Sequence, residues 1–201
     1  MTDIRCLCDA NIWIDACHGD LEKIYLDYFK MVGFAEQVHN EIIKFKSRTD
    51  EFVYIYDKYI ESENYYTVVK TNSLGKIETQ FKNQLRLAGF SDLDNSNKKI
   101  KNLGEYVSLY LAYHLKIPYI HTTDLDFIHK EKERLPDIQL YTWNEINGLI
   151  SKDDDERLAR NKEIERKKQL MNRNDIKQKE NKQIESKICK MKTYINSQRN
   201  K

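Results

Sequence analysis

The stretch that most constrains the fold spans residues 117–128 and reads IPYIHTTDLDFI. Its apolar start and its two threonines predict a short buried strand from Ile117 to Thr122. Asp124 comes just after this strand, and Asp126 follows two residues later. Because ligands bind at the carboxyl ends of strands in open α/β sheets, a carboxylate at this place is well positioned for function.

The same arrangement occurs near the N-terminus. The segment from Ile4 to Cys8 predicts a strand, which leads into Asp9 and Asn11 and then into a helical pattern. Asp9 and Asp124 are 115 positions apart in the sequence. The carboxyl ends of parallel strands lie at one edge of a sheet, so these two aspartates can meet there.

Helical and extended segments alternate along the rest of residues 1–150. Apolar residues spaced by three or four predict helices, and aromatic or β-branched runs predict strands. The expected helices cover residues 12–14, 21–31, 34–45, 49–60, 73–89, 103–116, 125–134 and 143–150, the further strands residues 65–69 and 138–141, and a long polar loop residues 91–102. The alternation predicts an α/β fold with a mostly parallel central sheet covered by helices on both faces.

The charge is divided unevenly along the chain. Residues 151–201 carry 16 Lys and Arg against 9 Asp and Glu, whereas residues 1–150 carry 18 against 23. The second part contains neither glycine nor proline and has too few apolar residues for a core of its own. We therefore expect a folded domain over residues 1–150 and a basic, charged tail over residues 151–201 that is helical or partly disordered.

Neither a membrane span nor a metal-binding cysteine motif is predicted. The longest apolar stretches are far shorter than the roughly 20 residues that cross a bilayer, and the N-terminus has no charged-then-apolar leader. We therefore expect a cytoplasmic protein without a membrane partner. The cysteines Cys6, Cys8, Cys17 and Cys189 lack CxxC spacing, so neither a zinc ribbon nor a thioredoxin-type motif is supported. Cys6, Cys8 and Cys17, the last followed by His18, could form a metal cluster, but buried free thiols are the more common arrangement.

Four carboxylates occupy comparable positions in this predicted fold. Asp9 and Asp124 follow strands, Glu41 lies on the helix over residues 34–45, and Glu105 opens a later helix. Carboxylates about 5 Å apart repel by roughly 3 kcal/mol per pair in a partly screened setting, so such a set protonates, spreads apart or holds a cation. Oxygen ligands favour Mg²⁺ or Mn²⁺ over zinc. Either ion can activate water near a phosphodiester, which is metal-assisted hydrolysis.

The four acidic segments, taken in this order, resemble the PIN-domain nucleases. The pattern of that family is an N-terminal strand ending in Asp-x-Asn, a helical Glu, a third acid that opens a later helix, and a strand followed by Thr or Ser and Asp. The matching segments read CLCDANIWID, VHNEI, LGEYVSLYLAYHLKIPYI and HTTDLDFI. The resemblance covers about residues 1–150.

This resemblance implies a PIN-like three-layer fold and an endoribonuclease that depends on Mg²⁺ or Mn²⁺. Many small bacterial members, of the VapC type, are toxins of toxin–antitoxin pairs, which implies an RNA substrate and an antitoxin or other protein partner. Two departures from the family leave the substrate open: the third acid is Glu105 where Asp is usual, and residues 47–102 form a longer segment than in minimal members. By resemblance, the catalytic and metal-binding acids are Asp9, Glu41, Glu105 and Asp124, and the supporting residues are Asn11, Thr123 and Asp126.

Other interpretations of these acids stay open. Asp9 and Asp124 are also typical helix N-caps, and Glu105 can complement the positive end of its helix. Asp15 and Glu145 are interpreted as surface acids. The alternative function is a catalytically silent PIN-like module that binds RNA or a protein, and metal dependence separates it from a nuclease. A nuclease acting on DNA flaps is a weaker third hypothesis, because such enzymes normally carry more acids.

The tail and the tyrosines have alternatives of their own. Cations of the tail could hold a polyanion beside the acidic first part of the chain. Ile184, Ile188, Met191 and Ile195 are spaced by four, three and four, which is the seam of a short amphipathic helix that could dock a protein. A homodimer is also left open. The spacing of the tyrosines fits packing faces of helices better than a stacking platform for RNA.

Overall fold

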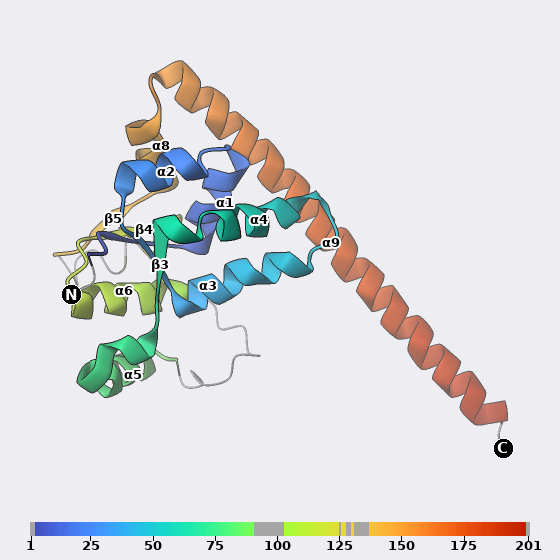
Figure 1. Cartoon of the computed structure of the whole chain (residues 1–201). Helices are drawn as coiled ribbons and strands as arrows, with labels where there is room; N and C mark the ends of the chain where they lie inside the picture. Colours follow the sequence, from blue (N-terminus) through green and yellow to red (C-terminus); the bar gives the residue numbers. More distant parts are fainter. Residues whose placement is uncertain (1–2, 91–102, 125, 128–129, 131–136, 200–201) are drawn as a thin grey trace.

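The protein is built around a five-stranded sheet. The computed structural model describes residues 3–90, 103–124, 126–127, 130 and 137–199. The strand order is β3-β2-β1-β4-β5, and every described pair is parallel (Figure 1). The strands are β1 (Cys6–Cys8), β2 (Val32–Ala35), β3 (Tyr66–Val69), β4 (Tyr119–His121) and β5 (Gln139–Tyr141). The α/β prediction is confirmed, and the described sheet is wholly rather than mostly parallel.

Helices lie on both sides of this sheet. Figure 1 shows α6 on one side and α2 and α8 on the other, which gives three layers. The α-helices are α1 (Ala10–His18), α2 (Glu22–Phe29), α3 (Glu36–Ile43), α4 (Tyr54–Glu61), α5 (Glu78–Leu87), α6 (Leu103–Leu115), α8 (Trp143–Ile150) and α9 (Asp154–Arg199). Short 3₁₀ turns are η1 (Lys44–Ser47), η2 (Glu51–Val53), η3 (Glu63–Tyr65) and η4 (Thr71–Ile77).

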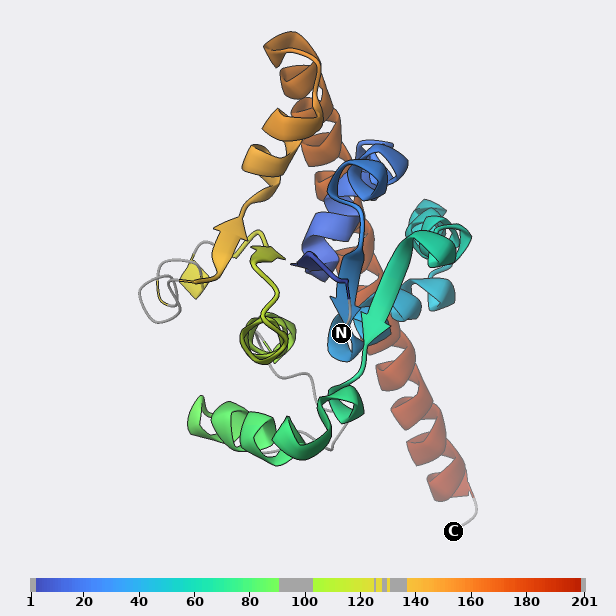
Figure 2. The ribbon, with the colours of Figure 1, turned by 60° about the vertical axis from the view of Figure 1, so that its left-hand side comes forward.

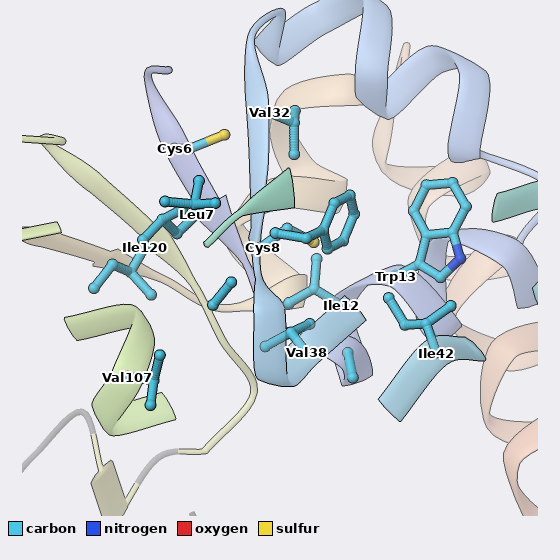
Figure 3. Close-up of a cluster of buried hydrophobic side chains, with 14 of the residues drawn as sticks. Cys6, Leu7, Cys8, Ile12, Trp13, Val32, Val38, Ile42, Val107 and Ile120 are labelled. Atoms are coloured by element: carbon cyan, nitrogen blue, oxygen red, sulfur yellow. The ribbon is translucent and has the colours of Figure 1, made fainter. Parts of the chain in front are cut away.

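The core forms where the two central strands meet the helices. Every residue of β1 and β2 is buried. Trp13 of α1 packs edge-on against Phe34 of β2 and Tyr59 of α4, with ring centroids 5.7 and 5.5 Å apart. Figure 3 shows this tryptophan in one cluster with Leu7 of β1 and Val107 of α6. Aromatic pairs of this kind contribute about 0.5–1.5 kcal/mol beyond their burial, so they help to fix α1 and α4 on the sheet.

The strand order reverses between β1 and β4. From β1 the chain moves outward through β2 and β3, and it then returns to place β4 and β5 on the other side of β1. Cys8 pairs with His121 at the ends of β1 and β4, and the Asp9 N–H donates to the His121 carbonyl at 3.0 Å. Ligands bind to open α/β sheets outside the strand ends at such a switch point.

The predicted helix over residues 34–45 is wrong at its start, because β2 occupies Val32–Ala35 and α3 begins only at Glu36. Four apolar residues are too few for periodicity to separate a buried strand from a helix. The structure adds a second constraint at Gly33. A Cβ there would lie 2.9 Å from side-chain carbons of both Ile4 and Leu7, so the close approach requires glycine.

Two other predicted helices are shorter than expected. The segment 49–60 begins with η2, which Asp50 caps by accepting from the Phe52 N–H at 3.3 Å, and α4 starts at Tyr54. The segment 73–89 begins with η4, in which Gly75 has a φ of 56°, so α5 starts at Glu78. The first segment starts as a 3₁₀ turn at the Asp50 cap, and the positive φ of Gly75 interrupts the second. The spacing of the apolar residues reveals neither feature.

Two further predictions fall at the edge of what the structure describes. The predicted loop over residues 91–102 lies outside the described residues. Most of the predicted helix over residues 125–134 does so as well, and of that segment only Asp126, Phe127 and Lys130 are described, each as helical.

The C-terminal tail is the single helix α9, so its predicted helical state is confirmed for the described part. Its first half packs on the rest of the chain: Ile164 is only 1% exposed, and Leu170 and Met171 are partly buried against the core. The division of the chain at residue 150 stays a prediction. Among the described helices, none is long and apolar enough to cross a membrane.

Candidate functional site

Asp9 lies at the switch point, between the end of β1 and the start of α1. Its Oδ1 accepts from the Ala10 N–H at 2.7 Å, and the Asn11 side-chain amide donates to its Oδ2 at 3.3 Å. The side chain caps α1, as the alternative interpretation predicts. Both of its oxygens are held, and the residue is only 5% exposed, so its direction is fixed by the fold.

The electrostatic setting of Asp9 is unfavourable for a negative charge. Burial chiefly raises the pKa of its carboxyl to about 7. The carboxylates of Glu105 and Glu41 raise it further, whereas the N–H groups of Ala10 and Asn11 lower it. Asp9 is therefore close enough to both glutamates to feel their charge, although they come from different helices.

Glu105 and Asp124 form the other half of the site. Glu105 lies in the first turn of α6, where burial raises its pKa and the carboxylate of Asp124 adds to the increase. Asp124 follows β4, and hydrogen bonds hold both its backbone and its side chain. Its N–H donates to Thr122 Oγ1 at 3.3 Å, and its Oδ1 accepts from the Phe127 N–H at 2.9 Å. Asp124 thus caps the turn that follows, as Asp9 caps α1.

Glu41 reaches the site from α3. The residue is exposed, and a Cβ added at Gly104 would lie 3.8 Å from Glu41 Oε1 and 3.5 Å from Val38. Both distances are ordinary van der Waals contacts, and because Gly104 precedes Glu105, they place the Glu41 carboxylate near the start of α6. This close approach was not foreseen from the sequence.

The structure therefore places all four predicted acids at one edge of the sheet, linked by the pairs Asp9–Glu105, Asp9–Glu41 and Glu105–Asp124. The supporting residues differ: Asn11 contacts Asp9, while Thr123 is half-buried and Asp126 exposed. Within the described residues, no three His, Cys, Asp or Glu side chains converge as tightly as the ligands of a metal ion do. The acids are neighbours that stay spread apart.

Two hollows lie along α5. One of about 390 Å³ is lined by residues of α5 and α6 together with Lys130, whose Nζ donates to the Tyr106 hydroxyl at 2.9 Å. Another of about 260 Å³ lies between α3 and α5, where Gln37 contributes to its wall. Tyr106 follows Glu105 in sequence, and Gln37 precedes Glu41 by one helical turn. Among the described residues, however, none of the four acids lines either hollow.

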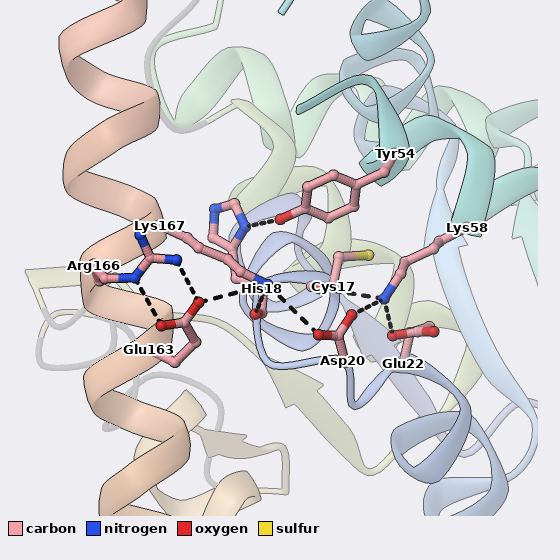
Figure 4. Close-up of polar contacts among 9 residues, drawn as sticks. All are labelled: Cys17, His18, Asp20, Glu22, Tyr54, Lys58, Glu163, Arg166 and Lys167. Atoms are coloured by element: carbon pink, nitrogen blue, oxygen red, sulfur yellow. Dashed lines mark hydrogen bonds and ion pairs between the residues drawn. The ribbon is translucent and has the colours of Figure 1, made fainter. Parts of the chain in front are cut away.

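A second polar cluster lies at the other end of α1 and was not predicted (Figure 4). Lys167 of α9 donates to the His18 carbonyl at 2.7 Å, and His18 Nδ1 lies 2.6 Å from the Tyr54 hydroxyl. Lys58 of α4 donates to Asp20 at 2.6 Å. Burial and Lys167 lower the pKa of His18 to about 4, so the ring is neutral at pH 7. The cluster ties α1 to α4 and α9.

The interpretation of Asp15 as a surface acid is wrong. The residue is 1% exposed and lies 2.9 Å from Lys168 Nζ of α9. Burial raises its pKa to about 6, and Lys168 opposes the increase. One signal was available, since Asp15 is the one charged residue in the run from Ala10 to Cys17. Glu145 is exposed as expected, and it completes a capping box with Thr142.

Comparisons with known families, proteins and structures gave no match. Its sequence matches no family model, no curated protein resembles it significantly, and no solved structure matches its fold. The resemblance to PIN-domain nucleases therefore rests on the acidic segments themselves.

Proposed function

We propose that the chain is a divalent-metal-dependent endoribonuclease of PIN type. The observation that carries this proposal is the gathering of Asp9, Glu41, Glu105 and Asp124 at the switch point between β1 and β4. They come from four separate segments of the chain. Placing like charges close together costs free energy, and such an arrangement is more typical of functional sites than of structural ones.

The donor chemistry fits Mg²⁺ or Mn²⁺. The four side chains offer only carboxylate oxygens, which hard divalent cations prefer. The raised pKa values of Asp9 and Glu105 show that their negative charge is poorly compensated, which is the condition that a cation relieves. A bound divalent cation supplies charge neutralisation for a phosphodiester and a more acidic water.

The protein's own groups would hold and orient this chemistry. Asp9 is directed by the Ala10 N–H and the Asn11 amide, and Asp124 by the Phe127 N–H. Such hydrogen bonds keep a ligand oxygen in place and limit its rotation. A phosphate at this edge would also meet the N-terminal end of α1, whose partial positive charge favours an anion.

Within this proposal the substrate is RNA, and the chain acts in the cytoplasm. The thiols of Cys6, Cys8 and Cys17 are free and buried, as in proteins of a reducing compartment. By its resemblance to VapC-type proteins, the chain would be the toxin of a toxin–antitoxin pair, and a small antitoxin would cover the acids.

One observation favours the alternative, a catalytically silent module that binds RNA or a protein. The acids do not converge into a tight ligand set within the described residues. A module of this kind would bind its partner equally well with EDTA, and neutral variants of the acids would leave the binding unchanged. Metal dependence separates the two functions.

The test is cleavage of a pool of structured RNA and of single-stranded DNA, with Mn²⁺ or with EDTA. We expect the wild type to cut RNA only with Mn²⁺. Asp124→Asn keeps the cap to Phe127 but loses a charge, and it should reduce the rate at least about 100-fold, since even outer partners of metal ligands are worth 10–100-fold. Asp27→Asn on the exposed face of α2 serves as the matched control and should cut normally.

Circular dichroism and thermal melting must first show that all three proteins are folded. If folded wild type cuts neither nucleic acid with Mn²⁺, or if Asp124→Asn cuts as fast as the wild type, the nuclease proposal is wrong. RNA binding that is equal with EDTA and in Asp124→Asn would then support the binding module.

A further inference from the structure

The distal part of α9 leaves the rest of the protein. The middle of the helix still contacts the body through an ion pair of 2.8 Å between Arg48 and Asp175 and a hydrogen bond of 3.5 Å from Gln178 to Asp50. From Lys179 to Lys192 every side chain is exposed. Figure 1 and Figure 2 show this segment, coloured red, extending away from the sheet and its helices.

An apolar seam runs along this exposed segment. Ile184, Ile188 and Met191 are 54%, 46% and 64% exposed, and Ile195 continues their spacing in the sequence. Spacings of four, three and four place these residues at alternating d and a positions of a heptad. Amphipathic helices take most of their stability from packing their apolar face, so we expect this seam to pack against a partner.

The charges beside the seam exclude a parallel copy as that partner. In heptad terms Glu180 and Lys187 are g positions, and Glu185 and Lys192 are the e positions that follow them. In a parallel pair each g residue faces the next e residue of the partner. Glu180 would then face Glu185, and Lys187 would face Lys192, so both contacts would be repulsive.

An antiparallel copy fits the same residues. When the partner helix runs in the opposite direction, e positions face e positions. Glu185 then faces the partner's Lys192, and the same contact occurs a second time by symmetry. The apolar layers match as well, since Ile184 would pack on the partner's Ile195 and Ile188 on the partner's Met191. In this single register the charged pairs attract each other and the apolar residues of the two seams pack together.

We propose that this chain forms a homodimer through an antiparallel two-helix coiled coil of the distal part of α9. The interface is isologous, as expected for a twofold dimer. It is short, with four apolar layers centred between Cys189 and Lys190. Association is therefore weak and depends on protein concentration. The inference does not depend on the proposed nuclease activity.

The test is sedimentation equilibrium of the full chain over a concentration series up to the high micromolar range. We expect a reversible monomer–dimer equilibrium for the wild type. Ile188→Ala should weaken association at least about tenfold, because it truncates both central layers. Ser186→Ala lies on the opposite face of the same helix, and it should leave the equilibrium unchanged.

Charge exchange tests the direction of the helices. Glu185→Lys alone and Lys192→Glu alone should each weaken association about tenfold or more, because two attractive contacts become repulsive. An equimolar mixture of the two single variants should restore the dimer, and the double variant should restore it as well. These variants are exposed, so folding of the body is unaffected and can be verified by its melting temperature.

The proposal fails if the wild type stays monomeric throughout the series. It also fails if a dimer forms but Ile188→Ala does not weaken it, since the interface then lies elsewhere. A mixture of single charge variants that associates no better than either variant alone contradicts the antiparallel register. RNA cleavage measured in parallel separates these outcomes from any failure of the nuclease proposal.

Discussion

Replacing Asp9 by asparagine should stabilise the metal-free protein while abolishing the proposed nuclease activity. Asparagine is as good an N-cap as aspartate, so α1 keeps its cap. The carboxyl of Asp9 has its pKa raised from 3.8 to about 7 by burial first, and then by Glu105 and Glu41. Because the pKa is higher in the folded state, ionisation of Asp9 lowers the free energy of unfolding. This destabilisation is absent below the unfolded-state pKa and complete above about pH 7.

The magnitude follows from the two pKa values. At pH 8 the ionised carboxylate destabilises the fold by about 4 kcal/mol, whereas at pH 5 the cost is about 2 kcal/mol, because the folded protein keeps the proton. Asparagine does not ionise, so Asp9→Asn removes this cost at both pH values. Its free energy of unfolding should therefore exceed that of the wild type by these amounts, and the excess should grow by roughly 2–3 kcal/mol from pH 5 to pH 8.

The assay is urea unfolding of both proteins at the two pH values, first with EDTA and then with Mn²⁺. If Mn²⁺ binds at the acids as proposed, saturating metal should stabilise only the wild type, by about 2.7 kcal/mol at a hundred times the dissociation constant, and the gap at pH 8 should narrow. Asp27→Asn on the surface of α2 should shift stability by less than about 0.5 kcal/mol. An excess that is the same at pH 5 and pH 8 would refute the reasoning, since it could not come from the ionisation of Asp9.

Three other substitutions test the fold. Lys168→Met leaves the buried carboxylate of Asp15 unpaired; it should cost about 3–5 kcal/mol in urea unfolding at pH 8 and much less at pH 5, below the pKa of about 6, where Asp15 is protonated. An equal cost at both pH values would contradict the pairing. Gly33→Ala should cost about 1–3 kcal/mol, because its Cβ would lie 2.9 Å from two neighbouring side chains; a neutral result would mean that the sheet relaxes easily. Ile164→Ala should cost about 2–5 kcal/mol and make α9 more sensitive to proteolysis, whereas an unchanged cleavage pattern would mean that the residue does not hold the helix.

Sequence signals close to each aspartate were enough to predict that Asp9 and Asp124 lie at one edge of the sheet. Asp9 and Asp124 directly follow apolar strands, and the α/β alternation requires those strand ends to share an edge. Glu41 and Glu105 needed the family pattern as well, because an acid on a helix is ordinary by itself. Whether the four act in catalysis stays a prediction.

The errors arose where the deciding contact is distant in sequence. β2 was missed because Gly33 packs on Ile4 and Leu7, which apolar spacing does not reveal. Asp15 was taken for a surface acid because its cation, Lys168, lies 153 positions away. Neither contact leaves a periodic trace in the sequence.

Helix α1 connects the two polar clusters of this protein. Asp9 caps its first turn at the acidic edge, while Asp15 and His18 contact α9 near its other end. If ligand binding at Asp9 and the docking of α9 are coupled through this helix, each changes the free energy of the other by the same amount. Release of α9 would then change the affinity for a ligand at the acids, although α9 contacts α1 near the opposite end of that helix.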